Sequence, residues 1–238
     1  MYKGYNLTSN LEERIKTLTR WMSEARHLVI FTGAGISTES GLPDFRGPDG
    51  LWTRRAKGLP PPKFDWSSAK PNESHMAITE LQNMGKLAFL ISQNVDNLHL
   101  KSGIHPDLLA ELHGNVTKLR CQGCGFKCDN FPDLTTCPIC GGRLASSVVN
   151  FGDPLPEKEL KEAEWHSRHS DLFIVVGSSL VVYPAAEMPR IALESGSKLV
   201  IINQQETPLD SVCHLRFRER AGEVLPQAIA SLKKLVVR

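Results

Sequence analysis

The sequence LVIFTGAGIS at residues 28–37 decides the expected fold. Its first four residues are all apolar, and a short run of this kind is typical of a strand buried on both faces of a parallel sheet. The turn that follows, Gly33-Ala34-Gly35, stands before a predicted helix, where backbone amides can cradle a pyrophosphate. The dinucleotide fingerprint has a third glycine where this chain has Thr38. For the turn alone we therefore favour a tight packing of helix on strand.

Other segments extend this pattern into alternating strands and helices. Further apolar runs predict buried strands at residues 87–93, 172–176 and 199–202. Apolar residues at helical spacing predict helices at residues 11–25, 75–84 and 221–235. This alternation predicts an α/β fold, a doubly wound parallel sheet with ligands beyond the carboxyl ends of its strands. The Pro, Gly and charge content of residues 43–66 predicts a long functional loop with little regular structure.

The composition is that of an ordinary globular protein, without a strong signal for nucleic-acid binding. The 238 residues include 28 Lys and Arg against 26 Asp and Glu, a net charge of +2, and the cations are scattered. No apolar run approaches the roughly 20 residues that cross a membrane. Residues 1–10 do not resemble a signal peptide. We therefore expect one domain with a small module attached, located in the cytoplasm, or in the nucleus if the source is eukaryotic.

Four of the six cysteines form two CxxC pairs, which is a strong signal for a metal site. Twelve residues separate Cys121 and Cys124 from Cys137 and Cys140. Two such knuckles present four thiolates to a tetrahedral zinc and leave no open position for water or substrate, so we expect a structural ion. Because this spacing is shorter than usual, Cys128 could replace one ligand. A pair of redox-active CxxC motifs is a second alternative.

A series of further motifs follows the glycine turn in order. They are GAGISTESGLPDFRG at residues 33–47, QNVDNLH at 93–99, LHGN at 112–115, FGD at 151–153, GSSL at 177–180 and IN at 202–203. Together with the paired cysteines, this order resembles that of the sirtuins, the NAD-dependent protein lysine deacylases, over nearly the whole chain. Residues 47–65 are similar to the class IV branch, which includes the animal nuclear sirtuins six and seven.

The resemblance implies a sirtuin-type fold, a Rossmann-like parallel sheet lobe with a small inserted zinc-ribbon module. The large lobe would comprise residues of about 11–44, 76–117 and 147–238, the cofactor loop residues 44–66 and the zinc module residues 118–146. The implied reaction moves the acyl group of an acyl-lysine in a protein or peptide onto NAD, which is consumed. Its products are free lysine, nicotinamide and O-acyl-ADP-ribose, and nicotinamide is expected to inhibit.

The resemblance also implies which residues bind NAD. The diphosphate side would be formed by Gly33, Ala34, Gly35 and Thr38. The cofactor loop would contribute Asp44, Phe45, Arg46 and Trp52. The nicotinamide end would be held by Gln93, Asn94 and Asp96, beside His113. The adenosine half would contact Gly177, Ser178, Ser179, Asn203, Gln205 and the backbone of Ala221.

His113 and Asn94 are the implied catalytic residues. An imidazole is the side chain best able to take a proton near neutral pH, and His113 stands in the family's His-Gly motif. It would help to deprotonate a ribose hydroxyl. The other histidines are expected to be surface or packing residues, with His99 in a structural role. Cys128 and Cys213 are expected to be semi-buried small hydrophobes.

The segment after the zinc module departs from the family pattern. Most sirtuins have Arg-Pro and two aromatic residues before Gly-Glu, whereas this chain has SSVVNFGD at residues 146–153. The residues expected to pair with the substrate peptide by β-addition are Val149, Asn150, Phe151 and Gly152. We therefore expect the departure at residues 146–153 to affect which peptides are preferred and how fast acetyl groups are removed. Trp52 and Thr53 stand in the neighbourhood where the desuccinylase branch has Tyr and Arg, so we predict neutral acyl groups, acetyl or longer.

Three other functions are compatible with parts of this pattern. A protein mono-ADP-ribosyltransferase would use the same NAD site, with a protein nucleophile in place of the acyl-lysine. A zinc-bearing chromatin or nucleic-acid reader with a vestigial NAD site is a second alternative, which the weak and scattered charge argues against. A dehydrogenase would need the missing third glycine and a hydride-accepting substrate site, and the sequence indicates neither.

Overall fold

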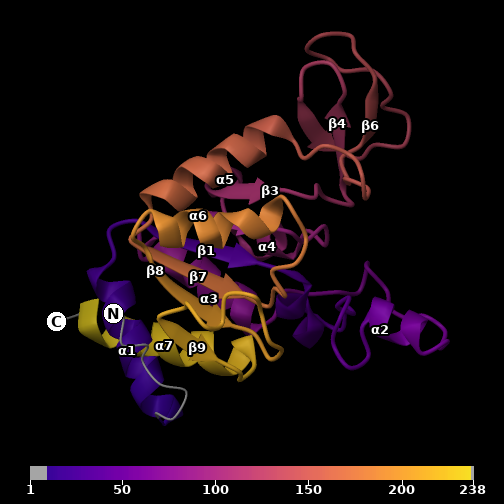
Figure 1. Cartoon of the computed structure of the whole chain (residues 1–238). Helices are drawn as coiled ribbons and strands as arrows, with labels where there is room; N and C mark the ends of the chain where they lie inside the picture. The colour runs from indigo at the N-terminus through magenta and orange to yellow at the C-terminus, as the bar shows by residue number, and fades with distance from the viewer. Residues whose placement is uncertain (1–9, 237–238) are drawn as a thin grey trace.

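The computed structural model of the chain describes residues 10–236. Its centre is a six-stranded sheet in the order β3-β2-β1-β7-β8-β9, and all neighbouring strands are parallel (Figure 1). The strands are β1 Leu28–Thr32, β2 Leu87–Ser92, β3 Leu109–Glu111, β7 Leu172–Val176, β8 Lys198–Ile202 and β9 Leu215–Phe217. The parallel sheet predicted from the apolar runs is confirmed, and two short outer strands complete it.

The two central strands are buried at every position, as expected for continuous apolar runs. β1 pairs with β7 in register, from Leu28 opposite Leu172 to Thr32 opposite Val176. From this pair the sheet extends through β2 on one side and through β8 on the other. The strand order therefore reverses between β1 and β7. Ligands bind doubly wound sheets in the crevice beyond the carboxyl ends of the strands at such a point.

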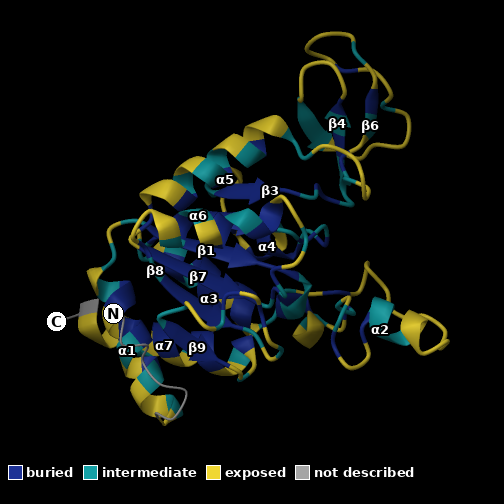
Figure 2. Ribbon diagram, viewed as in Figure 1, coloured by how far each residue is buried: buried dark blue, intermediate teal, exposed yellow. Residues whose placement is uncertain are grey.

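Helices cover both faces of the sheet and leave the strands dark in the burial colouring (Figure 2). The helices on one face are α1 Leu11–Glu24, α3 Glu73–Asn83 and α7 Ala221–Val236. Those on the other are α5 Glu157–His169 and α6 Met188–Glu194. Each set of helices closes its own apolar core against the sheet, and burial of the two cores supplies the main stabilisation of the lobe.

The sequence of helix α1 explains why it forms, through an apolar stripe and a capping side chain. Ile15, Leu18 and Met22 recur at the three- to four-residue spacing of a buried helical stripe, and all three are buried. The side chain of Asn10 accepts a hydrogen bond from the backbone N–H of Glu12 at 3.2 Å and so caps the first turn. Local capping and core burial therefore favour the same helix.

A second, smaller sheet stands apart from the main one (Figure 1). It is antiparallel in the order β5-β4-β6, with β4 Lys118–Cys121, β5 Lys127–Asp129 and β6 Leu144–Ser146. Its own apolar core is small, so it depends on further constraints. One such constraint joins the small sheet to α5. Glu159 Oε1 forms ion pairs with Arg120 Nη2 and with Lys127 Nζ, each at 2.7 Å.

Several elements correct the sequence expectations. The helix predicted at the glycine turn is present as a 3₁₀ helix, Ala34–Ser40, which begins within the turn itself. The expected irregular loop at residues 43–66 contains helix α2, Leu51–Ala56, which follows Gly50 and ends before Gly58. Helix α4, Leu98–Ser102, follows the QNVD motif, and 3₁₀ turns occur at Pro106–Leu108 and Ala185–Glu187. Pro and Gly thus separate short helices here.

Within residues 10–236, no helix combines the length and the apolarity needed to cross a membrane. The signal-peptide expectation concerns residues 1–10, and nearly all of that segment lies outside the described residues.

Candidate active site

A cavity of about 340 Å³ opens at the carboxyl ends of β1, β2, β7 and β8. It brings together most of the residues that the motifs indicated. Those residues are Gly33, Ala34, Gly35, Asp44, Phe45, Arg46, Trp52, Gln93, Asn94, Asp96, His113, Val149, Asn150, Phe151, Gly152, Gly177, Ser178, Ser179, Asn203 and Gln205. The place of the cavity, at the reversal of strand order, is the one expected for a ligand in this type of sheet.

The turns that follow β1 and β7 pack directly against each other in the floor of the cavity. The N–H of Gly35 donates to the carbonyl of Gly177 at 2.8 Å, and the N–H of Gly33 donates to Val176 O at 3.0 Å. A Cβ atom added at Gly177, where φ is +64°, would lie 2.3 Å from the backbone nitrogen of Ile36. The glycines therefore permit close contact of the two turns. The N–H groups of Gly33 and Gly35 thus donate to the backbone of the neighbouring turn, and the role of this turn in binding a diphosphate stays a prediction.

A buried polar cluster forms the next part of the wall. The hydroxyl of Ser37 donates to Asp96 Oδ2 at 2.6 Å and accepts from Asn94 Nδ2 at 3.2 Å. The other oxygen of Asp96 accepts the N–H of Leu98 at 2.9 Å. Asn94 and Asp96 are both over nine-tenths buried. Ser37 thus fixes an amide and a carboxylate side by side, a pair able to bind a group that has both a donor and an acceptor.

Gln93 links the ends of two strands across the cavity. Its Oε1 accepts a hydrogen bond from Ser178 Oγ at 2.6 Å, and its backbone N–H donates to Thr32 O at 2.9 Å. The backbone carbonyl of Gln93 also forms a hydrogen bond with Nδ1 of His113, at 2.9 Å. Because a carbonyl oxygen can only accept, Nδ1 has the proton and Nε2 is the free acceptor nitrogen.

Burial sets the protonation of His113. Removal from water disfavours the charged ring and lowers the pKa of His113 from its ordinary 6.5, while the hydrogen bond to Gln93 raises it in part. The imidazole is therefore neutral at pH 7. A neutral ring with a fixed tautomer can accept a proton at Nε2 from a group bound in the cavity.

The cofactor loop, residues 44–66, supplies an aromatic wall and a cation. The guanidinium of Arg46 lies 4.2 Å from the ring centroid of Trp52 and donates to Ser179 Oγ at 3.2 Å. Trp52 also contacts Phe45 and Phe151, with ring centroids 5.3 and 5.7 Å away. Among the described residues, Arg46 is the only Lys or Arg that lines the cavity.

The segment expected to meet the substrate peptide is an open loop after β6, not a strand. The N–H of Val149 donates to the carbonyl of His113 at 3.0 Å, which places this segment beside the histidine. The side chain of Asn150 donates to Asp153 Oδ2 at 3.1 Å, and Phe151 is 77% exposed. The exposed backbone of this loop is available for strand addition by a peptide.

Two of the expected cofactor residues do not line the cavity. Thr38 is exposed, and its hydroxyl donates to the carbonyl of Gly35 at 2.9 Å. Ala221 begins α7 behind the glycine turn, where the N–H of Gly222 donates to Glu39 Oε2 at 3.0 Å. Their roles in ligand binding stay predictions.

Sequence reasoning missed some lining residues, above all Ser37, Phe64, Trp66 and Tyr183. Ser37 stood in the quoted motif but received no role, because its partners come from a different strand end. Phe64 and Trp66 lie in the cofactor loop and pack edge to face at 5.4 Å. Their presence in a polar, Pro-rich loop was the signal that could have indicated an apolar wall.

The other motif histidine, His99, for which a structural role was expected, lies in the interior. It is fully buried, and its Nε2 lies 2.9 Å from the hydroxyl of Thr32. His75, on α3, packs against it with ring centroids 4.9 Å apart. Both rings lie in the interior, and neither lines the cavity.

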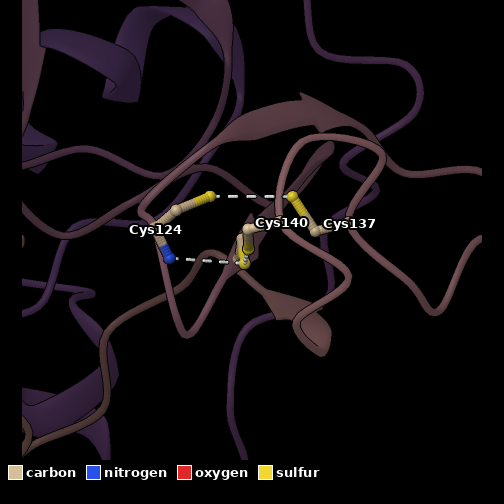
Figure 3. A group of neighbouring side chains, drawn as sticks. Cys124, Cys137 and Cys140 are labelled. Carbon is tan, nitrogen blue, oxygen red and sulfur yellow. Dashed lines mark hydrogen bonds between the residues drawn. The ribbon is translucent and has the colours of Figure 1, made fainter.

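The four predicted metal ligands converge in the small module. Their sulfur atoms all lie within 4.8 Å of one another. Cys121 and Cys140 are 3.5 Å apart at sulfur, and Cys124 and Cys137 are 3.6 Å apart. Figure 3 shows the sulfur atoms of Cys124 and Cys137 turned toward one another, with Cys140 beside them. Tetrahedral zinc with bonds of about 2.3 Å places its sulfur ligands about 3.8 Å apart, so the cluster fits a structural zinc.

The module geometry also decides between the cysteine alternatives. Cys128 lies on β5 and packs in the small core of the module, outside the four-sulfur group. The CxxC pairs lie in turns of a three-stranded sheet, and neither begins a helix as a thioredoxin-type motif does. Cys213, half-buried beside Asp210, is likewise outside the cluster, and burial raises the pKa of its thiol to about 11. The arrangement favours a four-thiolate metal site.

Comparison with protein families matches the chain to the model described as "Sir2 family" over residues 33–60 and 61–184. These residues include the glycine turn, the buried polar cluster, His113 and the four cysteines.

Individual proteins agree with this match. "NAD-dependent protein deacylase 2" of Archaeoglobus fulgidus is 39% identical over 94% of this chain and 98% of its own length. "NAD-dependent protein deacetylase SRT1" of Arabidopsis thaliana is 40% identical over 93% of this chain, which spans only 50% of that plant protein. A solved structure described as "Sir2-p53 peptide-NAD+" is 36% identical with a TM-score of 0.73, covering 94% of this chain and 99% of that one.

Proposed function

The chain belongs to the Sir2 family, and on that premise we propose that it is an NAD-dependent deacylase acting on acyl-lysine in a protein. The observation that carries the proposal is the place of His113, held in one tautomer on the wall of the cavity that also contains the glycine turn and Asp96. The products would be free lysine, nicotinamide and O-acyl-ADP-ribose. Nicotinamide would inhibit by returning to the site that it leaves.

The cavity lining suits NAD in its polar chemistry. When bound, NAD supplies a ribose whose bond to nicotinamide can break. Asn94 and Asp96, fixed by Ser37, offer a donor and an acceptor to a carboxamide. Arg46 offers its guanidinium and Ser179 its hydroxyl to a diphosphate. The negative charge of the diphosphate would thus be paired with Arg46, the only Lys or Arg that lines the cavity within the described residues.

His113 would serve as the base. Its Nε2 is unprotonated because Nδ1 donates to Gln93, and burial keeps the ring neutral. From this position the ring can take a proton from a ribose hydroxyl. Asn94 would support the reaction by orienting the nicotinamide end. Val149, held by the carbonyl of His113, would bring the peptide backbone beside the same ring.

We further propose neutral acyl groups, acetyl or longer, as substrates. Aromatic side chains of the cofactor loop line the cavity, and Trp52 packs between Arg46 and Phe151. Because Arg46 is assigned to the diphosphate and no other Lys or Arg lines the cavity within the described residues, no cation remains there to pair with an acidic acyl group. The similarity of residues 47–65 to the class IV sirtuins is consistent with this preference.

A panel of acyl peptides tests the acyl preference. Acetyl-, myristoyl- and succinyl-lysine peptides of one sequence would be compared by kcat/KM. We expect either neutral group to exceed succinyl, and Trp66→Ala to lower myristoyl turnover more than acetyl turnover. The distant exposed Trp165→Ala serves as the matched control. Succinyl-lysine as the best substrate would overturn the proposed preference.

The proposed location is the cytoplasm. All six cysteines are free thiols within the described residues, and four of them form a metal cluster that needs reduced thiolates. ADP-ribosyl transfer is not proposed as the main activity, because the matched relatives are named deacylases and deacetylases.

A further inference from the structure

One hydrogen bond joins two walls of the cavity, the cofactor loop and the loop after β8, which are far apart in the sequence. Gln205, in the loop after β8, donates its side-chain Nε2 to the carbonyl oxygen of Arg46 at 2.8 Å. The same carbonyl accepts from Thr53 Oγ1 at 3.1 Å. Only the nitrogen of the Gln205 amide can donate to a carbonyl, so the chemistry fixes the orientation of this amide.

A buried cation holds the loop from which Gln205 extends. Arg216, on β9, is 4% exposed. Its guanidinium donates to the carbonyls of Asn203 and Gln205, both at 2.6 Å, and also contacts that of Phe217. Its Nε donates to Asp210 Oδ1 at 2.9 Å, so the buried charge is paired. A planar guanidinium with five donors suits this multiple contact, and it fixes the backbone on either side of residue 204.

Gln205 contacts the backbone of Arg46 and not its side chain. This contact is therefore distinct from any role of the Arg46 guanidinium. That side chain lies against Trp52 and Ser179. Gln204, the next residue to Gln205, is exposed and has no place in the cavity wall. The loop thus turns one glutamine toward the cofactor loop and the other toward solvent.

We propose that Gln205 is a positioning residue that ties the cofactor loop to the end of β8. Arg216 orients Gln205 by holding the backbone of its loop. The tie sets the backbone of Arg46, and through it the wall of Phe45 and Arg46, before a nucleotide enters. This deepens the proposed function and rests on it for the identity of the nucleotide. A direct contact between the Gln205 side chain and NAD, as the resemblance implied, is a different role for the same residue.

Loss of the tie would affect binding more than chemistry. Without the donor, part of the population would hold the cofactor loop away from the cavity, and NAD binding would have to restore the ordered form. Gln205→Met keeps the length of the side chain and removes its N–H groups. We expect KM for NAD to rise about three- to tenfold, the range for one neutral hydrogen bond, with kcat nearly unchanged. Gln204→Met is the matched control and leaves both constants as they are.

A second readout does not depend on turnover. Arg55 and Lys57 are exposed in and just after α2, within the cofactor loop, and trypsin cleaves there when the loop opens. In the absence of NAD, Gln205→Met should raise the cleavage rate at these sites several-fold, whereas Gln204→Met should not. Arg216→Lys should raise it as well. If Arg216 acts through Gln205, the double variant should be cleaved no faster than the faster single variant.

The outcomes separate the inference from the function on which it builds. A raised KM with an unchanged cleavage rate would show direct contact of Gln205 with NAD and overturn the tie. Unchanged values of both would also overturn it, and additive effects in the double variant would overturn the role given to Arg216. Faster cleavage in Gln205→Met, with no NAD consumption by the unaltered protein under any condition, would support the tie and contradict the proposed function.

Discussion

The Nδ1 atom of His113 lies 2.9 Å from the carbonyl oxygen of Gln93, and this contact decides which ring nitrogen can act as a base. Gln93, which follows β2, is in turn held by Ser178 after the end of β7, on the far side of β1. The histidine is therefore oriented by the sheet itself and not by a mobile loop. General base catalysis requires such a fixed orientation together with one defined tautomer, in which Nε2 has no proton.

The pH dependence of turnover should reflect this environment. His113 acts only when neutral, and burial lowers its pKa from 6.5. Activity is therefore present above that lowered pKa and is lost as the pH falls through it. We expect the acid limb of kcat/KM to have its midpoint below pH 6.5. A midpoint clearly above 6.5 would contradict the assignment of His113 as a buried neutral base.

Ser37→Ala should damage the nicotinamide end of the site without unfolding the protein. The substitution removes the hydroxyl that holds Asp96 Oδ2 and Asn94 Nδ2. The loss of one charge-assisted hydrogen bond is about 1.5–3 kcal/mol, so we expect kcat/KM for NAD to fall by about tenfold or more. Ser195→Ala, at an exposed serine after α6, is the control. Equal kinetics of the two variants would show that Ser37 does not organise the pair.

The zinc assignment predicts a difference between two cysteines of the same module. Cys124→Ser removes a ligand, whereas Cys128→Ser alters a core residue outside the cluster. We expect the unaltered chain and Cys128→Ser to hold one zinc per chain and Cys124→Ser to lose it, with unfolding of residues 118–146. Metal content by elemental analysis and the melting temperature measure this. Loss of zinc in Cys128→Ser with retention in Cys124→Ser would reverse the ligand set.

Glu159 should contribute to the stability of the junction between α5 and the small sheet. Burial alone raises the pKa of Glu159, but hydrogen bonds from Arg120 and Lys127 outweigh this and lower that pKa to about 2. The stabilisation is therefore complete above the unfolded carboxyl pKa of about 4.3 and is lost as the pH falls from there towards 2.

The substitution Glu159→Gln tests this junction at neutral pH. It leaves Arg120 without its carboxylate and Lys127 with only the more distant Glu111 at 3.7 Å, and we expect a loss of about 1–3 kcal/mol in the free energy of unfolding. Glu157→Gln, two residues earlier in an exposed pair with Lys161, should leave the stability nearly unchanged. Denaturant titration at pH 7 and pH 3 measures both. If Glu159→Gln costs as much at pH 3 as at pH 7, then the ion pairs do not stabilise the native state.

The central fold was predictable because its signal is local. The apolar runs of β1 and β7 have bounds in the structure within one residue of those predicted, since strands buried on both faces need no alternation. The outer strands β3 and β9 were missed. Each has three residues with a charged member, Glu111 or Arg216. Each charge has a partner from another part of the fold: Lys127 Nζ lies 3.7 Å from Glu111, and Arg216 donates to the carbonyl of Asn203 at 2.6 Å. A single sequence does not display such partners.

The site was predictable to the extent that its residues stand in motifs. The motif residues converge on one cavity because the strand ends that hold them are adjacent in the sheet. What could not be predicted is the set of contacts between motifs, such as Ser37 with Asp96 and Gln205 with Arg46. These depend on how two turns face each other, which is decided by packing and not by spacing.

The proposed function requires that this cavity consume NAD only to remove an acyl group from lysine. The most direct measurement is nicotinamide release from NAD by the purified chain with acyl-lysine peptide, with the unmodified peptide and with His113→Ala. We expect release that requires the acyl group, matches the deacylated peptide formed and falls by about a hundredfold or more in the variant. Release without an acyl group, accompanied by ADP-ribosylated protein, would contradict the proposed deacylase activity. Release that persists in His113→Ala would contradict the role of His113 as its base.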